Sequence, residues 1–301
     1  MKKDLVCYPT RFGNMVHDRR DKCIGESLRI YGEWAPGEIA ILNQTIKRGD
    51  LVLDVGANVG FHALFFSKKV GKHGQVIAFE PLKTNYDILN INAQINNLDN
   101  LTLYNALVSD SSEIVFSPAF ISNESNLGAT SFQTASPVEA TISPLLQLTI
   151  DDLKLERCSL IKIDVEGMER KVLEGAFDTL DRQRPVIFFE QNTESNFTEI
   201  QALLGRLNYK CFWSVSKAFP KFNIRQNQVD IFRGNTETNI LAVPHDAVET
   251  YEFLEHLAVV DPTTYNKPAL SEMPDQYFVN SNLLSQVDLQ WAHFLSSFFR
   301  A

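Results

Sequence analysis

The spacing of hydrophobic residues changes at residue 56, and this change predicts the first unit of the fold. Residues 51–55 (LVLDV) form a mostly apolar run, which is typical of a strand buried on both faces. Residues 61–70 then carry apolar side chains at helical spacing, and Gly56 and Gly60 bracket the turn between the two segments. A strand, a glycine turn and a helix in this order begin the nucleotide site of a doubly wound α/β sheet.

Further segments repeat this alternation along the chain. Apolar runs predict strands over residues 75–80, 101–107, 160–164, 184–192 and 209–215, and helical spacing predicts helices over 39–46, 84–97, 167–180 and 197–207. In the helix over 84–97 we expect Leu89, Ile91 and Ile95 to face inward and the asparagines to face outward. Residues 229–232 and 239–244 are expected to close the sheet as an antiparallel pair. The pattern therefore predicts an α/β sheet of seven mostly parallel strands with helices on both faces.

Segments outside this alternation divide the chain into three parts. We expect an N-terminal extension over residues 1–49 (a hairpin and a helix), a central domain over 50–244, and a helical C-terminal extension over 245–301. Residues 111–150 are rich in serine, threonine and proline and read as a β-hairpin or lid inserted beside the site. Within the C-terminal extension, residues 246–259 look helical and 262–274 look like a loop. An apolar stripe over residues 284–298 packs on its own domain or forms the face of a homodimer.

Composition narrows the classes of function. The formal net charge of −9 argues against nucleic acid as the main partner, because a phosphate backbone is bound by a basic surface. The four cysteines show no paired or zinc-binding spacing, so they read as free thiols in a reducing compartment. The N-terminus lacks a signal-peptide pattern, and no run approaches the roughly 20 apolar residues of a membrane span. We therefore expect a cytoplasmic protein.

The glycine turn favours a cationic ligand over a phosphate. The segment 54–60 (DVGANVG) lacks the lysine of a phosphate-binding loop and the Gly-x-Gly-x-x-Gly of a dinucleotide site. Asp54 lies where a carboxylate repels a pyrophosphate and attracts a cation such as the sulfonium of S-adenosylmethionine. Glu80 ends the second strand, where it can accept hydrogen bonds from the ribose hydroxyls of an adenosine. The alternatives are a nicotinamide-binding turn, which would make the protein an oxidoreductase, and a turn with a structural role only.

Three further residues are candidates for contact with the cofactor. Glu38, together with Trp34, lies just before the first sheet strand and can fold over the ligand, or it begins a helix with Trp34 in the core. Asn105 and Ser109 follow the third strand and can read the adenine ring, although an ordinary strand exit explains them equally well.

Carboxylates also end two later strands. Asp164 follows the strand beginning at residue 160, and Glu190 and Asn192 end the next one. Because parallel strands end at the same edge of a sheet, we expect these side chains to meet in one crevice. Helix capping explains an acid such as Asp164 or Glu166 individually, but not the convergence of three acids and Asn192.

Together these segments resemble the FkbM family of S-adenosylmethionine-dependent methyltransferases. The resemblance rests on YGEW with Glu38, on DVGANVG and AFEP, and on residues 149–153 (TIDDL) and 161–169 (IKIDVEGME); it spans about residues 25–245. It implies a class I methyltransferase fold, O-methylation of sugar or macrolide hydroxyls, and a cofactor held by Gly56, Asn58 and Glu80, with Gly60 in the same loop. It places Asp164, also a candidate cofactor ligand, and Glu166 near the transferred methyl.

The chemistry of methyl transfer leaves several hypotheses open. An aliphatic hydroxyl needs a base or a metal to lose its proton, and His62 or Asp164 can be that base. His62 can instead have only a packing or orienting role. Asp164, Glu190 and Asn192 offer oxygen ligands that suit Mg²⁺. A non-catalytic protein that binds the cofactor within a biosynthetic complex is a further alternative. The acceptor, a small molecule or glycan, is not identified by the sequence; its choice is expected to lie in residues 111–150 and 213–227.

Overall fold

The computed structural model describes residues 4–118 and 142–270, and its centre is a seven-stranded sheet. The strands lie in the order β11-β12-β10-β9-β3-β4-β5. Their bounds are β3 Leu51–Val55, β4 Gln75–Phe79, β5 Leu101–Tyr104, β9 Leu160–Ile163, β10 Val186–Glu190, β11 Tyr209–Lys217 and β12 Thr236–Pro244. Strands β5, β4, β3, β9 and β10 are parallel, and β12 pairs antiparallel with both β10 and β11. This is the predicted class I methyltransferase architecture.

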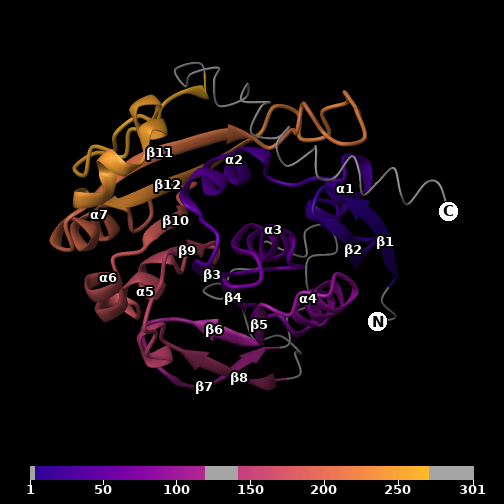
Figure 1. The fold of residues 1–301 in the computed structure, drawn as a ribbon, viewed down its shortest axis with the longest axis horizontal. Coiled ribbons are helices and arrows are strands. Elements are labelled where there is room, and N and C mark those ends of the chain that lie inside the picture. The colour runs from indigo at the N-terminus through magenta and orange to yellow at the C-terminus, as the bar shows by residue number, and fades with distance from the viewer. Residues whose placement is uncertain (1–3, 119–141, 271–301) are drawn as a thin grey trace.

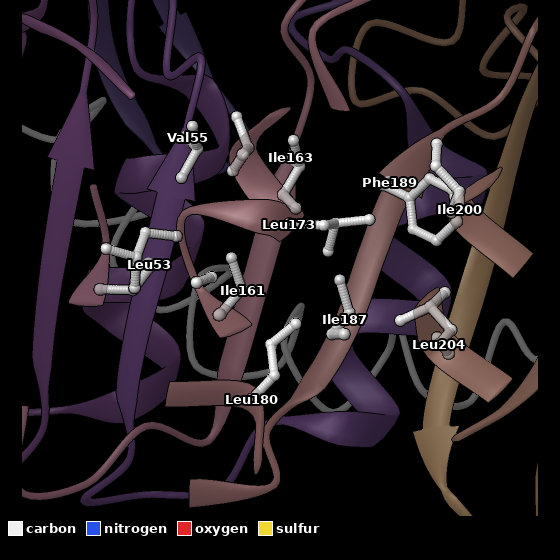
Figure 2. Close-up of a cluster of buried hydrophobic side chains, with 14 of the residues drawn as sticks. Leu53, Val55, Ile161, Ile163, Leu173, Leu180, Ile187, Phe189, Ile200 and Leu204 are labelled. Atoms are coloured by element: carbon white, nitrogen blue, oxygen red, sulfur yellow. The ribbon is translucent and has the colours of Figure 1, made fainter. Parts of the chain in front are cut away.

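Helices cover both faces of this sheet (Figure 1). One face packs on α2 Pro36–Thr45, α3 Phe61–Val70 and α4 Lys83–Ile95, and the other on α5 Glu169–Glu174, α6 Phe177–Gln183 and α7 Phe197–Arg206. In Figure 2, Leu53, Ile161 and Ile187 from neighbouring strands meet Leu180 and Leu204 from the second set of helices. Because both faces are buried, the central strands are almost continuously apolar, and each fully buried leucine or isoleucine contributes roughly 1.5–3 kcal/mol.

The N-terminal extension contains the predicted hairpin. Strands β1 Leu5–Thr10 and β2 Gly13–Asp18 pair antiparallel, and the short helix α1 Ile24–Ile30 follows. Asn92 of α4 fixes this hairpin to the core: its Oδ1 accepts from Val16 N at 2.7 Å, and its Nδ2 donates to Val16 O at 3.0 Å and Val59 O at 2.8 Å. Asn92 is therefore buried and Ile95 is exposed, so the predicted inward face of this helix was wrong at both positions.

Two other elements differ from the prediction because tertiary contacts interrupt them. The third strand ends at Tyr104, and β6 Ala106–Val108 instead joins a separate sheet with β7 Glu113–Pro118 and β8 Ile142–Leu148. The predicted helix over 167–180 is divided into α5 and α6. Asp151, in the short 3₁₀ turn η1 Asp151–Leu153, accepts from Asp178 N at 3.0 Å and from Thr179 N at 2.8 Å, and so begins the second helix.

The insertion and the C-terminal part are only partly described. β7 and β8 form the antiparallel hairpin expected after residue 111, whereas residues 119–141 lie outside the described residues. Residues 246–259 were expected to be helical, but they contain two 3₁₀ turns, η2 His245–Thr250 and η3 Glu252–His256. The apolar stripe over 284–298, and with it the homodimer hypothesis, lies outside the described residues.

The strand predicted over residues 229–232 is wrong. The backbone there bonds to a side chain: the Tyr31 hydroxyl donates to Val229 O, and Ile231 N donates to that hydroxyl at 3.0 Å. Asp230 accepts from Phe232 N and Gly234 N, which produces a turn. The antiparallel pair is instead β11 with β12. Among the described residues, no helix has both the length and the apolar character to span a membrane.

Candidate functional site

A pocket lies at the edge of the sheet where β3, β4 and β9 end. Its wall is built from the glycine turn after β3, residues 80–82 after β4, residues 106–108, and residues 164–166 after β9. Ile24 and Trp34 of the N-terminal extension also line the pocket, as do Phe61 and His62 of α3 and Lys162 of β9. The topology therefore brings together the segments that the sequence analysis singled out, because parallel strands deliver their carboxyl ends to one edge.

Close contacts within the protein require glycine at two positions of this turn. Gly56 (φ +83°) and Gly60 (φ +94°) lie in the left-handed region that favours glycine. A Cβ on Gly56 would lie 1.8 Å from the backbone oxygen of Asp164, and a Cβ on Gly60 would lie 2.3 Å from Leu89 Cδ1. Gly56 therefore allows β3 and β9 to approach each other at the pocket wall, and Gly60 lets α3 begin close against α4.

Glu80 lies in the pocket wall with its carboxylate held by backbone amides. Asn58 N donates to Oε2 at 2.8 Å and Leu82 N donates to Oε1 at 2.9 Å. Asn58 itself has a φ of +50°, in the left-handed region. Burial raises the pKa of Glu80 to about 7, against the opposing effect of the two amides. A ligand that donates hydrogen bonds can use the remaining lone pairs of this carboxylate.

Asn105 and Ser109 lie behind the pocket wall. Asn105 Nδ2 donates to the backbone oxygens of Glu80 and Pro81, at 2.8 and 3.0 Å, so it braces the turn that carries Glu80. Ser109 is buried and its Oγ donates to Asp110 Oδ1 at 3.0 Å. Neither side chain lines the pocket; residues 106–108 occupy that position.

A buried lysine that the sequence analysis missed links two of the predicted acids. Lys162 of β9 is 2% exposed; its Nζ lies 3.2 Å from Asp164 Oδ2 and 3.7 Å from Asp54 Oδ1. Asp54 is fully buried, and neither of its carboxylate oxygens has a hydrogen-bond partner among the residues that the structure describes. Burial raises the pKa of Asp54, and Lys162 opposes that rise. The signal was a lysine inside the apolar run LIKI, two residues before Asp164.

Glu38 is placed behind His62 rather than in the pocket lining. His62 Nε2 lies 3.1 Å from Glu38 Oε2, and Asn239 Nδ2 of β12 donates to Glu38 Oε1 at 3.0 Å. Burial would raise the pKa of Glu38, but His62, Lys162 and Asn239 outweigh it and lower the pKa. Asn239 was not foreseen, since it is 201 residues from Glu38 in the sequence.

Three acids form a cluster at the end of β9 and β10. Asp164, Glu166 and Glu190 each offer a carboxylate oxygen, and these oxygens all lie within 4.8 Å of one another. Burial, with repulsion from Asp164, raises the pKa of Glu166 to about 7 and that of Glu190 to about 10. Asn192 does not join them as a ligand: its Nδ2 donates to Glu190 and its Oδ1 accepts from Thr238 N at 3.3 Å.

Sequence comparison places this site within a known family. Residues 54–211, more than half of the chain, match the family model for the methyltransferase FkbM domain. Hexuronic acid methyltransferase AglP of Haloferax volcanii is 29% identical over 154 residues, which cover 50% of this chain and 59% of AglP. Methyltransferase sdnD of Sordaria araneosa is 25% identical over 154 residues, covering 41% of this chain and 59% of sdnD. The chain thus spans 59% of the length of each of these relatives.

Comparison with solved structures gives weaker similarity. The crystal structure of methyltransferase FkbM from Methylobacillus flagellatus KT aligns with a TM-score of 0.42 and 17% identity, covering 64% of this chain and 43% of that one. An O-methyltransferase from Bacillus cereus in complex with SAH aligns with a TM-score of 0.39 and 14% identity, covering 69% of this chain and 80% of that one. Because both TM-scores are below 0.5, the family of this chain rests on the match to the family model, and its fold rests on the strand order.

Proposed function

This chain belongs to the FkbM methyltransferase family, and from that premise we propose that it transfers a methyl group from S-adenosylmethionine to a hydroxyl of a sugar or secondary metabolite. The donor supplies an electrophilic methyl group on a sulfonium. The protein supplies the pocket that orients donor and acceptor in line, which is a large part of the catalysis of such a displacement.

One observation carries the proposal: a glutamate carboxylate held by two backbone amides in the pocket wall beside the glycine turn. Glu80 accepts at 2.8 and 2.9 Å from Asn58 N and Leu82 N, which fixes its position while leaving acceptor capacity for ribose hydroxyls. Asp164 also lines the pocket, and its carboxylate favours a cation over a pyrophosphate. Asp54 lies behind the lining, beside Lys162. Gly56 and Asn58 complete the proposed cofactor contacts, with Gly60 setting the conformation of the turn.

The acceptor is proposed from chemistry and from one relative. AglP is named as a hexuronic acid methyltransferase, which supports a sugar as acceptor. The net charge of −9 disfavours a nucleic acid as the acceptor.

His62 and Asp164 line the pocket and are the proposed bases, with Glu166 beside them. The four cysteines are unpaired, which supports the cytoplasm as the compartment.

A second version of the proposed mechanism uses a divalent cation. The cluster of Asp164, Glu166 and Glu190 offers three carboxylates, and Mg²⁺ prefers such oxygen ligands. Burial and repulsion from neighbouring acids raise the pKa of Glu190, and a cation there would relieve the repulsion. Turnover that is unaffected by EDTA and by added Mg²⁺ would exclude this version.

Calorimetric titration tests the proposed function. We expect the protein to bind S-adenosylmethionine and S-adenosylhomocysteine but not NAD, and we expect Glu80→Ala to weaken both at least 10-fold. Glu199→Ala, which removes an exposed glutamate of α7, is the matched control and should bind as the parent does. Binding of NAD alone, or of no ligand, would refute the proposal. Binding without turnover on a panel of hydroxylated sugars and secondary metabolites would favour the non-catalytic alternative.

A further inference from the structure

A histidine, a glutamate and an asparagine from three separate elements form a chain that ends at the pocket. His62 lies in the first turn of α3, Glu38 in the first turn of α2, and Asn239 in β12. The distances are 3.1 Å from His62 Nε2 to Glu38 Oε2 and 3.0 Å from Asn239 Nδ2 to Glu38 Oε1. All three side chains are buried, but of the three only His62 lines the pocket.

We propose that Glu38 positions His62 as the general base that takes the proton of the acceptor hydroxyl. This inference rests on the proposed function and names the base that the proposed function leaves open. The Glu38 carboxylate lies 3.1 Å from Nε2 of the imidazole, and its negative charge favours the tautomer that carries the proton on Nε2. That tautomer leaves the lone pair of Nδ1 free to take up a proton. Asn239 holds the other oxygen of Glu38, so that the carboxylate keeps its orientation. Glu38 is therefore a positioning residue and not a cofactor ligand.

The proton and electron balance of the step is simple. The acceptor hydroxyl gives its proton to His62 Nδ1 while its oxygen forms a bond to the methyl carbon. The electron pair of the broken carbon–sulfur bond stays on sulfur, which becomes a neutral sulfide. The imidazolium formed faces the Glu38 carboxylate, which stabilises its charge, and it then releases its proton to solvent.

The surroundings of the imidazole favour His62 over the competing base. The ring is held between Phe61 and Phe66, whose ring centroids lie 6.1 and 6.0 Å away. The charged groups that interact with it are Glu38 from α2 and Asp54 from β3. Asp164, the alternative base, receives a hydrogen bond from Lys162 Nζ at 3.2 Å. One oxygen of that carboxylate is therefore already engaged by a side chain of the protein.

The first measurement is ¹⁵N NMR of histidine-labelled protein, which reports the ring nitrogen that carries the proton and needs no acceptor. We expect His62 in the parent to carry its proton on Nε2 and to keep it there in Glu38→Asp. In Glu38→Gln we expect that preference to be lost. His73→Gln, which changes an exposed histidine away from the pocket, assigns the signals and should leave the His62 tautomer unchanged. A proton on Nδ1 in the parent would overturn the proposal.

The second measurement is the rate of methyl transfer. We expect Glu38→Gln and His62→Gln each to lower kcat about 100-fold with little change in donor affinity, since general bases contribute typically 10²–10⁴-fold. The double variant should lose no more than His62→Gln alone, and Glu38→Asp should recover part of the rate. Parent-like turnover in Glu38→Gln would refute the positioning role while leaving the proposed function intact. Failure of the parent to bind the donor would instead refute the proposed function.

Discussion

Replacing Lys162 by methionine tests how the buried charges beneath the pocket are stabilised. Lys162 is 2% exposed, and its Nζ lies 3.7 Å from an oxygen of the fully buried Asp54. Removing one partner of a buried ion pair leaves an uncompensated charge and typically costs about 3–5 kcal/mol. We expect Lys162→Met to lose about 4 kcal/mol of unfolding free energy at pH 8.

The pH dependence of this loss identifies its cause. Burial already raises the pKa of Asp54, and without Lys162 that pKa rises further, so the carboxyl takes up a proton on folding. A group with a raised pKa in the folded state contributes stability below its unfolded pKa and loses it as the pH rises. The deficit of the variant should therefore shrink by up to about 1.4 kcal/mol per pH unit on going down from pH 8. At pH 5.5 we expect a deficit of about 1 kcal/mol.

Urea denaturation of the parent and the variant at pH 5.5 and pH 8 measures both quantities. Lys210→Met is the matched control: Lys210 also lies on a sheet strand, but it is half-buried and contacts the ring of Phe212. Its replacement should cost about 1 kcal/mol or less, with no pH dependence. A deficit for Lys162→Met below about 1 kcal/mol at pH 8, or one of equal size at both pH values, would refute this reasoning.

Three further predictions concern stability and can be measured by the same denaturation experiments. Gly56→Ala should cost at least about 3 kcal/mol because the added Cβ would clash with the Asp164 backbone. Gly49→Ala, at φ +90°, should cost only about 1–2 kcal/mol, because among the described residues no atom beyond the chain neighbours lies within 4 Å of the added Cβ; equal losses would contradict the contact at Gly56. Asn92→Ala should cost about 2–4 kcal/mol because the buried Asn92 side chain loses two hydrogen bonds to the hairpin and one to Val59 of the glycine turn. Asn96→Ala, whose bonds to Asn14 are exposed, should cost less than about 1 kcal/mol. Glu190→Gln should stabilise the protein by about 1–3 kcal/mol at pH 8, and this gain should vanish near pH 5. The pKa of Glu190 is raised to about 10 in the folded protein, so above about pH 4.5 the ionisation of this group favours the unfolded chain. A gain in stability that does not depend on pH would exclude this cause.

The sequence was sufficient to predict the parts of the fold that depend on local pattern. The apolar run 51–55, the glycine turn and helix α3 are where the spacing predicted them, because a strand buried on both faces and an amphipathic helix each require a distinct periodicity. The position of Glu80, Asp164 and Glu190 at the same edge of the sheet also followed from the sequence. Each residue ends or directly follows a parallel strand, and parallel strands in one sheet end on the same side.

What the sequence did not predict is the set of contacts between distant segments. The apolar period of α4 gave no sign that Asn92 would be buried, because its partner Val16 lies 76 residues earlier in the hairpin. Lys162 stands in an apolar run, and only the register that sets it opposite Asp54 makes it an ion-pair partner. Glu38, His62 and Asn239 come together because α2 and α3 pack on one face of the sheet to which β12 belongs. Local patterns set which elements form, whereas hydrogen bonds and charge pairs across the sheet depend on positions that only the folded chain defines.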